Sequence, residues 1–453
     1  MRVKALFIAI AAGLFWLVAA SANAAPAPVP LVSAGQPVDW WFAYKFNAAS
    51  FPTQALDPDK ACAFGGRGMA YPSESLAYAV ADAKHSSLRQ GPGLLGTGQD
   101  DPLGATFGEI FSGDYNYVVY NDQFYGDPEI ADGTCRGDSC DAPWAHAKGV
   151  IAWNDQGDGL ILQVTTPSWP HSGGQAYPAA HGNSLGCVER PNNIMYAQHF
   201  FALRAAEPDL KVVLHALANA GILTFPGVDQ VVHLTPGGPP DLAAIARGLG
   251  NDKPADPQLI HQTLSTGVQV ISKPASLHVP VWQLVSAALG GEDLRVASWW
   301  SRRDGIWSFG PGAPPCWDSN LGVPGRVEIA KSGAWLGKSF GLEQGSSHAK
   351  IAVSLPGGHR YTIFGDMNQS GTFSGDCHNA RGQTARGGLF FVVSDPQLFM
   401  SVSQLLAGST EGEWPQVRTS RGAHPLARTH KASHHSQTTR RARRHRPAAM
   451  HGA

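Results

Sequence analysis

The sequence has few charged residues and few cysteines, and it lacks the patterns that mark several common protein classes. Only 15% of its 453 residues are charged while 43% are hydrophobic, so the chain can form two or three domains with substantial cores. The six cysteines contain no Cys-x-x-Cys pair, which argues against a zinc ribbon or a thioredoxin-like redox site. Beyond the N-terminal region, no apolar stretch approaches the length of a transmembrane helix.

The N-terminus has the three parts of a secretory signal peptide. Residues 1–4 carry positive charge, residues 5–20 are mainly apolar, and Ala-Asn-Ala at residues 22–24 matches the small-x-small site of signal peptidase. The apolar run is short for a membrane anchor. We therefore expect residues 1–24 to be removed, which leaves a secreted or periplasmic protein that is not attached to a membrane.

In an oxidising compartment the cysteines are expected to form disulfides, and their even number agrees with this. Six cysteines allow fifteen pairings. Cys135 and Cys140 are close in sequence, so this pair is the first to test by digestion under non-reducing conditions. The other four are Cys62, Cys187, Cys316 and Cys377.

Charge is distributed unevenly along the chain. Residues 418–446 contain nine Lys or Arg residues and no carboxylate, which leaves 25 basic against 35 acidic residues in the rest. Residues 410–453 also lack periodic apolar positions, so we expect a disordered basic tail. Two functions are open for this tail, nonspecific binding of polyanions and a solubilising role without a specific ligand.

Strand and helix patterns alternate along the chain, which favours an α/β fold over an all-β sandwich. Strands are expected at residues 35–47, 118–121, 149–153, 159–164 and 361–364. Helices are expected at residues 193–206, 241–250 and 280–289.

A short motif occurs twice. Ala-His-Ala-Lys at residues 145–148 is followed about two hundred residues later by Ser-His-Ala-Lys at residues 347–350, and each copy leads into an apolar run. In an extended chain the His and the Lys of one copy point to the same side. Two halves, residues 25–230 and 231–409, are therefore expected to contribute one copy each to a site on a pseudo-twofold axis.

Two imidazoles and two ammonium groups suit the hydrolysis of a phosphodiester. One histidine attacks phosphorus, the other protonates the leaving oxygen, and the lysines stabilise the phosphoryl oxygens. Water activated by the second histidine then hydrolyses the phosphohistidine. This chemistry requires no metal.

A turn near the second motif adds a further candidate. Phe-Gly-Asp-Met-Asn at residues 364–368 follows after one more strand, so a turn there is expected to bring the Asn368 amide beside His348. In the first half, the comparable turn at residues 166–170 offers the hydroxyl of Ser168 instead.

At these residues the sequence resembles deoxyribonuclease II, a family related to the phospholipase D superfamily. The similar blocks follow the order of the family and extend from Gly35 to about Val393. They are residues 35–40, Tyr44 and Lys45, and residues 120–123, 146–150, 348–350 and 365–368.

The resemblance implies a phospholipase D-like fold of two similar halves, each with a mixed β-sheet flanked by helices, and an active site where the halves meet. It also implies an acid endonuclease that hydrolyses DNA without a metal or another cofactor. The expected intermediate is a phosphohistidine, the expected products have 3′-phosphate and 5′-hydroxyl ends, and the expected assembly is a homodimer.

The resemblance also implies roles for single residues. His146 is assigned as the nucleophile and His348 as the general acid, while Lys148 and Lys350 bind phosphate. Ser168 stands where the family has asparagine, and Asp155 is displaced from the aspartate spacing of the phospholipase D motif. The candidate substrate-binding residues are Lys45, Asp122, Ser168, Asp366 and Asn368.

The residues alone also allow plainer interpretations of three of these matching positions. Asp39 is expected to be a buried strand residue, Lys45 a solvated cation, and Asp122 a residue that fixes a turn.

A metal-dependent enzyme or a calcium-binding module is the first alternative. Residues 366–371 imitate the start of an EF-hand loop, but position twelve is Cys377 instead of a glutamate. His171, His181 and His199 are a second set of candidate metal ligands.

Two further alternatives keep the fold but change the function. One is an inactive secreted protein that binds a ligand through aromatic residues such as Trp299 and Trp300. The other retains the chemistry but acts on a phospholipid or a small phosphodiester. Initial rates on plasmid DNA, RNA and a phosphatidyl substrate distinguish these alternatives.

Overall fold

The computed structural model describes most of the chain up to residue 415, and residues up to Trp414 form one compact unit. The predicted signal peptide, Cys135 and Cys140, and the tail beyond residue 415 lie outside the described residues. The described residues are 26–53, 76–96, 100–112, 115–122, 145–166, 195–222, 224–225, 228–229, 231–235, 237–251, 256–298, 306–343, 345–369, 373, 377 and 383–415.

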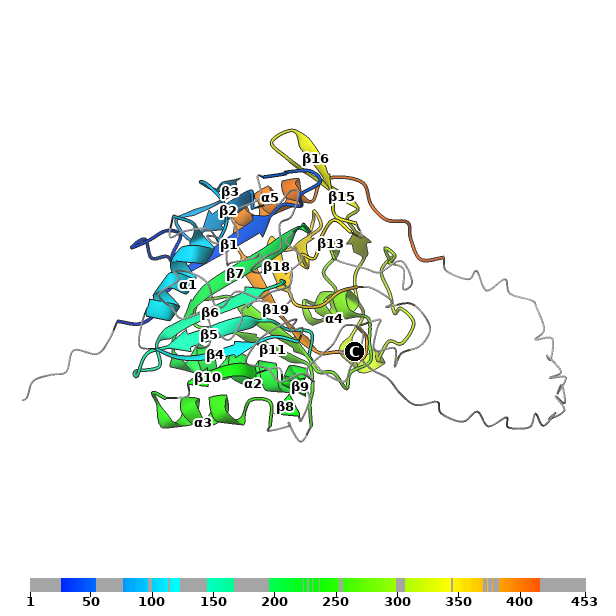
Figure 1. Cartoon of the computed structure of the whole chain (residues 1–453). Coiled ribbons are helices and arrows are strands. Elements are labelled where there is room, and N and C mark those ends of the chain that lie inside the picture. Colours follow the sequence, from blue (N-terminus) through cyan, green and yellow to red (C-terminus); the bar gives the residue numbers. More distant parts are fainter. Residues whose placement is uncertain are drawn as a thin grey trace, which may run out of the picture. The chain divides into compact units, whose positions relative to one another are not determined.

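The first large sheet has eight strands in the order β10-β4-β5-β6-β7-β1-β2-β3 (Figure 1). All neighbouring strands in it pair antiparallel. The strands are β1 (Trp40–Lys45), β2 (Tyr78–Asp82), β3 (His85–Gln90), β4 (Asn116–Tyr120), β5 (Gly149–Trp153), β6 (Gly159–Val164), β7 (Gln198–Ala205) and β10 (Val231–Thr235).

The second large sheet has seven strands in the order β11-β12-β19-β18-β17-β13-β14. It is mixed, because β13 and β14 are parallel while the other neighbours are antiparallel. The strands are β11 (Ile260–Thr263), β12 (Gln269–Lys273), β13 (Leu294–Ala297), β14 (Val327–Ile329), β17 (Ile351–Ser354), β18 (Tyr361–Gly365) and β19 (Gly388–Ser394).

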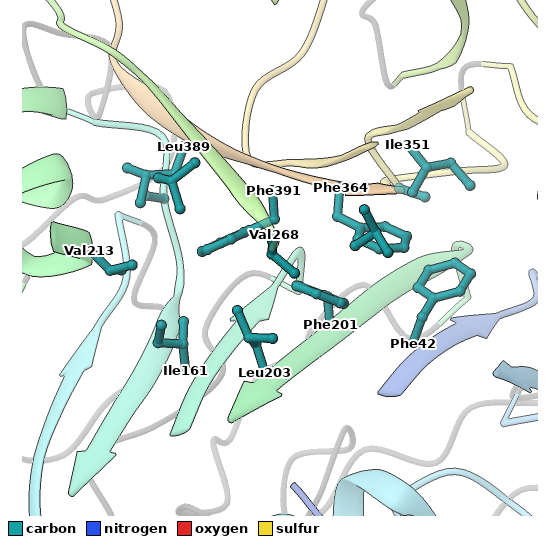
Figure 2. Packing of buried hydrophobic residues seen from close by; sticks show 14 of the residues in the cluster. Phe42, Ile161, Phe201, Leu203, Val213, Val268, Ile351, Phe364, Leu389 and Phe391 are labelled. Atoms are coloured by element: carbon teal, nitrogen blue, oxygen red, sulfur yellow. The ribbon is translucent and has the colours of Figure 1, made fainter. Parts of the chain in front are cut away.

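The main hydrophobic core lies between the two sheets. Figure 2 shows side chains of the first sheet, such as Phe42 and Phe201, facing Phe364 and Phe391 of the second. The Phe364 ring stacks on Phe42 at 4.5 Å and on Phe201 at 4.6 Å between centroids. Alternate residues of the same strands face the opposite side of each sheet, as the two-residue period of a strand requires. These central strands are therefore buried on both faces.

Helices cover the outer faces and the flanks of this core. The helix α1 (Pro102–Ser112) packs on the outer face of the first sheet, and α4 (Val281–Ala288) packs on the outer face of the second. The helices α2 (Glu207–Ala220) and α5 (Pro396–Leu405) place Val213 and Val402 in the core between the sheets. The remaining elements are α3 (Pro240–Gly248), which packs on α2, the hairpins β8 (Thr224–Phe225) with β9 (Val228–Asp229) and β15 (Ser332–Trp335) with β16 (Lys338–Gly341), and a short 3-10 helix (Ser319–Leu321).

The predicted α/β class is confirmed, and each of the five predicted strands overlaps a strand of the structure. The helices predicted at residues 241–250 and 280–289 correspond to α3 and α4, although Pro280 precedes α4 as its N-cap.

The helix predicted at residues 193–206 is wrong. Gln198–Ala205 is β7, a central strand between β6 and β1, and the next helix begins only at Glu207. Both faces of β7 are covered by core residues, so its near-continuous apolar run imitates the spacing of a helix. Tertiary packing therefore decides the structure of this segment.

The structure agrees with the prediction of disulfides and corrects the predicted start of the disordered tail. Cys316 and Cys377 form a disulfide, in agreement with the expectation of an oxidised protein. Residues 410–414, predicted to begin the disordered tail, belong to the compact unit: Thr410 bridges to Ala330, and the Trp414 ring contacts Trp307. Among the described residues, no helix is both long and apolar enough to cross a membrane.

Candidate functional site

The first histidine motif lies in an extended segment directly before β5. Ala145 forms a parallel bridge with Gly387, the residue before β19 of the other sheet. The His146 N–H donates to the Gly387 carbonyl at 2.7 Å, and the Val164 N–H donates to the Lys148 carbonyl at 3.1 Å. This motif therefore leads into the first sheet while its main chain is bound to the second.

The second motif leads into the second sheet and has the corresponding contacts with the first. Ser347 forms a parallel bridge with Ala197, the residue before β7. The His348 N–H donates to the Ala197 carbonyl at 2.7 Å, and the Gly365 N–H donates to the Lys350 carbonyl at 2.8 Å. The two motifs are thus held at the junction of the two sheets by matching hydrogen bonds.

The imidazole of His146 is buried and has a defined orientation. Its Nδ1 donates to the main-chain oxygen of Asp366 at 2.7 Å, because a carbonyl only accepts. Its Nε2 lies 4.0 Å from Oδ2 of Asp122. The other carboxylate oxygen of Asp122 accepts a short hydrogen bond from Lys148, and Oδ2 also accepts from the Arg386 guanidinium at 2.6 Å. Asp122 is therefore a fixed, charge-compensated carboxylate beside His146.

The side chain of Asp366 is also buried, between β6 and β19. Its Oδ1 accepts from the Gln163 amide at 2.9 Å and its Oδ2 from the Leu389 N–H at 3.0 Å. Burial raises the pKa of Asp366 to about 7, and the Leu389 N–H only partly offsets this effect. The carboxyl of Asp366 thus titrates near neutrality.

His348 contacts a lysine through its main chain and an aromatic ring through its imidazole. The Lys350 ammonium donates to the main-chain oxygen of His348 at 2.6 Å. The ring of Tyr196 stacks on the imidazole with 4.9 Å between centroids and an angle of 7°. The Lys350 N–H donates to Nδ1 of His199, which fixes the segment that carries the motif.

The charges of the two motifs act on one another. Burial lowers the pKa of His146 well below its ordinary value, and Lys148 lowers it further. Burial also lowers the pKa of His348, with additional contributions from Lys350 and Lys148. Since Lys148 of one motif affects the histidine of the other, the four residues form one site. Both histidines are neutral at neutral pH in the absence of a bound anion.

Asp122 remains ionised in this cluster. Burial opposes its ionisation, but the charges of Lys148 and Arg386, together with the hydrogen bond from Lys148, outweigh that effect and lower its pKa. Burial lowers the pKa of both Lys148 and Lys350, because an ammonium loses its hydration there. A phosphate that enters the site would favour the charged form of both lysines.

The comparison with family models gives a match over residues 30–411, and the matching model is Deoxyribonuclease II. The chain belongs to the deoxyribonuclease II family. A search of curated proteins finds no match. As a member of this family the protein is a deoxyribonuclease, an enzyme that hydrolyses DNA.

The deoxyribonuclease brings together most of its predicted site residues. His146, Lys148, His348 and Lys350 meet at the sheet junction, and Asp122 and Asp366 join them on the His146 side. Ser168 lies outside the described residues. Asn368 is buried, and its Oδ1 has no hydrogen-bond partner among the described residues.

The plainer interpretations of three matching residues are wrong. Asp39 is exposed at the surface, 3.8 Å from Arg204, and is not a buried strand residue. Lys45 is fully buried and not solvated, because its ammonium donates to the main-chain oxygens of Tyr196 and Phe46. Asp122 forms two ion pairs instead of only fixing a turn.

The proposed metal ligands are not brought together in the described part of the deoxyribonuclease. His199 lies in the core beside Phe42 and Phe364, and His171 and His181 lie outside the described residues. No group of three or more His, Cys, Asp or Glu among the described residues has the arrangement of a metal site.

The sequence reasoning missed Arg386, Tyr196 and Gln163. Arg386 precedes Gly387 and Gly388 at the start of β19, and Tyr196 precedes β7. Both positions lie one residue before the bridges that hold the histidine motifs. Only the pairing of β7 and β19 with the motif segments identifies them, and that pairing has no signal in sequence spacing.

Proposed function

We propose that the protein is a secreted, metal-independent endonuclease in which His146 attacks a DNA phosphodiester and His348 protonates the leaving oxygen. The observation that carries this proposal is the meeting of the two motifs. The His146 N–H is bound to the residue before β19 of the second sheet, and the His348 N–H to the residue before β7 of the first. The products are expected to have 3′-phosphate and 5′-hydroxyl ends.

We further propose that the two sheets represent two phospholipase D-like halves. The strand order β4-β5-β6-β7-β1 parallels β13-β17-β18-β19-β12, with α2 after β7 and α5 after β19. The division between residues 25–230 and 231–409 remains a prediction. Residues directly after this division form β10, which pairs with β4 and extends the first sheet.

In the first step, Nε2 of His146 forms a bond to phosphorus and the P–O5′ bond breaks. The proton remains on Nδ1, hydrogen-bonded to the Asp366 carbonyl. Nε2 therefore carries the lone pair that attack requires. The leaving O5′ receives the proton of His348 and departs as a hydroxyl.

In the second step, water attacks phosphorus and the N–P bond breaks. His348, now neutral, accepts the proton of the water, and His146 regains its lone pair. The enzyme returns to its starting protonation state and releases a 3′-phosphate end. The same two residues therefore serve both steps.

Lys148 and Lys350 are proposed to stabilise the phosphoryl oxygens. Each lies two residues after its histidine and both act on the histidine of the other motif. Two buried ammonium groups provide fixed positive charge where the transition state gains negative charge on oxygen. This is the charge stabilisation that a divalent metal supplies in other nucleases.

Secretion is proposed from the N-terminal signal pattern and is compatible with the Cys316–Cys377 disulfide. A homodimer remains a prediction of the family resemblance.

Plasmid nicking in excess EDTA at about pH 5, where an ordinary histidine is mostly protonated, tests the proposal. The mature protein is compared with His146→Ala, His348→Ala and His85→Ala, whose imidazole is exposed on β3. We expect wild type and His85→Ala to nick the plasmid and the other two variants to be inactive. Loss of wild-type activity in EDTA, or activity in both site variants, would refute the mechanism.

A further inference from the structure

The residues before β7 and β19 occupy corresponding positions. Lys45 donates to the main-chain oxygens of Tyr196 at 2.7 Å and Phe46 at 3.2 Å. Lys273 donates to the main-chain oxygens of Arg386 at 2.6 Å and Pro274 at 3.3 Å.

The residues that follow are also equivalent, because the Ala197 and Gly387 carbonyls accept from the His348 and His146 N–H groups at the same distance, 2.7 Å. The main-chain hydrogen bonds at Tyr196 and Arg386 therefore correspond, with Lys273 donating in addition to the Thr384 oxygen at 2.9 Å, and the two positions differ in side chain.

On one side of the site this position holds a guanidinium. Arg386 is buried and donates to Oδ2 of Asp122 at 2.6 Å and to the Ala145 carbonyl at 3.2 Å. The Ala145 carbonyl directly precedes His146. Arg386 thus fixes both the backbone of the motif and the carboxylate whose Oδ2 is 4.0 Å from the His146 Nε2.

On the other side the same position holds an aromatic ring. Tyr196 stacks nearly parallel on His348, and both side chains are partly exposed. The stack holds the imidazole by its face. The π face of a tyrosine also attracts a cation, so it stabilises the protonated imidazole.

These surroundings suit different steps of phosphodiester cleavage. When Nε2 of His146 bonds to phosphorus while Nδ1 keeps its proton, the ring becomes a cation, and the Asp122 carboxylate stabilises the charge that develops. His348 instead has to carry a proton before the reaction and release it to the leaving oxygen, and Tyr196 stabilises that starting state.

We propose that Arg386 and Tyr196 are positioning residues that give the two histidines different roles. Arg386, through Asp122, commits His146 to attack on phosphorus, and Tyr196 commits His348 to proton donation. This inference rests on the proposed function, since it assumes cleavage by the paired histidines.

Two substrates with different leaving groups test the assignment. A DNA oligonucleotide releases an alkoxide that needs a proton, whereas thymidine 3′-(4-nitrophenyl phosphate) releases a nitrophenolate that departs without one. The release in the first turnover is measured for each, because it reports N–P bond formation before water enters the reaction. A variant that impairs only proton donation then loses activity on DNA and little on the nitrophenyl ester.

We expect His348→Ala to lose about 100- to 10,000-fold on DNA, the usual contribution of a general acid, and less than about tenfold on the nitrophenyl ester. Tyr196→Leu follows the same pattern with a smaller loss, and Tyr196→Phe retains activity because the stacked ring remains. His146→Ala, Asp122→Asn and Arg386→Gln lose activity on both substrates by similar factors. Arg386→Lys keeps the positive charge beside Asp122, so it should lose less activity than Arg386→Gln on both substrates, and an equal loss in the two variants would contradict a role through that charge.

The chain offers matched controls for both positions. Tyr361 stacks on His359 at 4.9 Å and 11°, so Tyr361→Leu removes an equivalent stack outside the site. Arg295→Gln removes an arginine that pairs with Glu328. Neither change is expected to alter the ratio of the two rates.

A second readout identifies the attacking residue. His348→Ala should accumulate a phosphoenzyme from the nitrophenyl ester, because its hydrolysis lacks a base, and peptide mapping should place the phosphate on His146. A phosphate on another residue, or an Arg386 variant that loses activity on DNA alone, overturns the assigned roles. If His146→Ala cleaves both substrates at the wild-type rate, the proposed function itself fails.

Discussion

His146 and Asp366 are 220 residues apart in sequence, yet the imidazole Nδ1 of one donates to the main-chain oxygen of the other at 2.7 Å. The bond places the proton on Nδ1 and leaves the lone pair on Nε2. Asp366 directly follows β18. This strand lies in the second sheet beside β17, the strand that follows the second motif. The second sheet thus sets the tautomer of the histidine that leads into the first.

The pH dependence of activity should follow the depressed pKa of His348. Burial, Lys350 and Lys148 lower this pKa below 6.5 in the unliganded protein. A general acid has to be protonated, so kcat/KM on DNA should fall as the pH rises through that pKa, and the enzyme should be most active in acid. A series of kcat/KM values between about pH 4 and about pH 8 measures this fall, which is the descending limb of the pH profile.

Replacing Lys350 with methionine should move the same limb to higher pH, since its positive charge is one cause of the low pKa. The total rate should fall because a phosphate contact is lost. Lys338→Met, which removes an exposed lysine on β16, is the control. If the descending limb stays at the same pH in the Lys350 variant, His348 is not the group whose titration it reports.

Much of the fold and the four catalytic candidates could be predicted from the sequence. Strands such as β5 and β6 have continuous apolar runs, and the repeated His-x-Lys spacing identifies His146 and His348 without structural information. β7 could not be predicted in the same way. Its apolar residues serve two cores, one on each face, so their spacing fits both a helix and a buried strand.

The surroundings of the catalytic candidates depend on contacts between distant segments. Arg386 reaches Asp122 across 264 residues, and the buried Lys45 ammonium donates to the main-chain oxygen of Tyr196, 151 residues away. A local pattern predicts the residue types that can do the chemistry. It does not predict which buried charges compensate one another, because that depends on how the two sheets meet.

Lys45 and Lys273 should each be important for stability. Both ammonium groups are buried and donate to main-chain oxygens, and methionine would remove these hydrogen bonds. We expect Lys45→Met and Lys273→Met to lower the free energy of unfolding by about 1–3 kcal/mol each. Lys84→Met is the control, because Lys84 donates to the Pro37 carbonyl at an exposed position. Urea unfolding measures the three values, and equal losses in all of them would contradict a special role for the buried pair.

The Cys316–Cys377 disulfide should stabilise the compact unit. The two cysteines are separated by 61 residues, and closing a loop of that length lowers the entropy of the unfolded chain by an amount equivalent to about 4 kcal/mol. The double variant Cys316→Ser/Cys377→Ser should therefore have a lower Tm, and wild type in reductant should approach the same value. A Tm unaffected by both treatments would show that the bond constrains little.

Two truncations should define where the compact unit ends. Glu413 pairs with Arg326 at 3.0 Å, and Trp414 contacts the rings of Trp307 and Phe373. A chain that ends at Glu411 lacks these contacts and should have a lower Tm, whereas a chain that ends at Pro415 should match the full-length protein. The same pair tests the basic tail, because affinity for DNA at low salt changes in both truncations only if the tail binds DNA. Equal Tm values in all three proteins would place the end of the compact unit before residue 411.

Asp366 should make the stability of the protein depend on pH. Its pKa is raised to about 7 by burial, above the ordinary value of 3.8, so the folded protein binds more protons than the unfolded chain between these values. The contribution of Asp366 is therefore fully present below about pH 4 and is lost as the pH rises through about 7.

In Asp366→Asn this group no longer titrates, and the fall in the free energy of unfolding over that interval should become smaller. The introduced amide can be accommodated, because Oε1 of Gln163 has no hydrogen-bond partner among the described residues and can accept from it after rotation of the amide. Asp155→Asn, at an exposed position, is the control. Urea unfolding at several pH values measures the difference between wild type and each variant. A difference for Asp366→Asn that is the same at every pH would mean that the carboxyl is ionised throughout, and the charge of the site would then have to be balanced by Lys148 and Lys350.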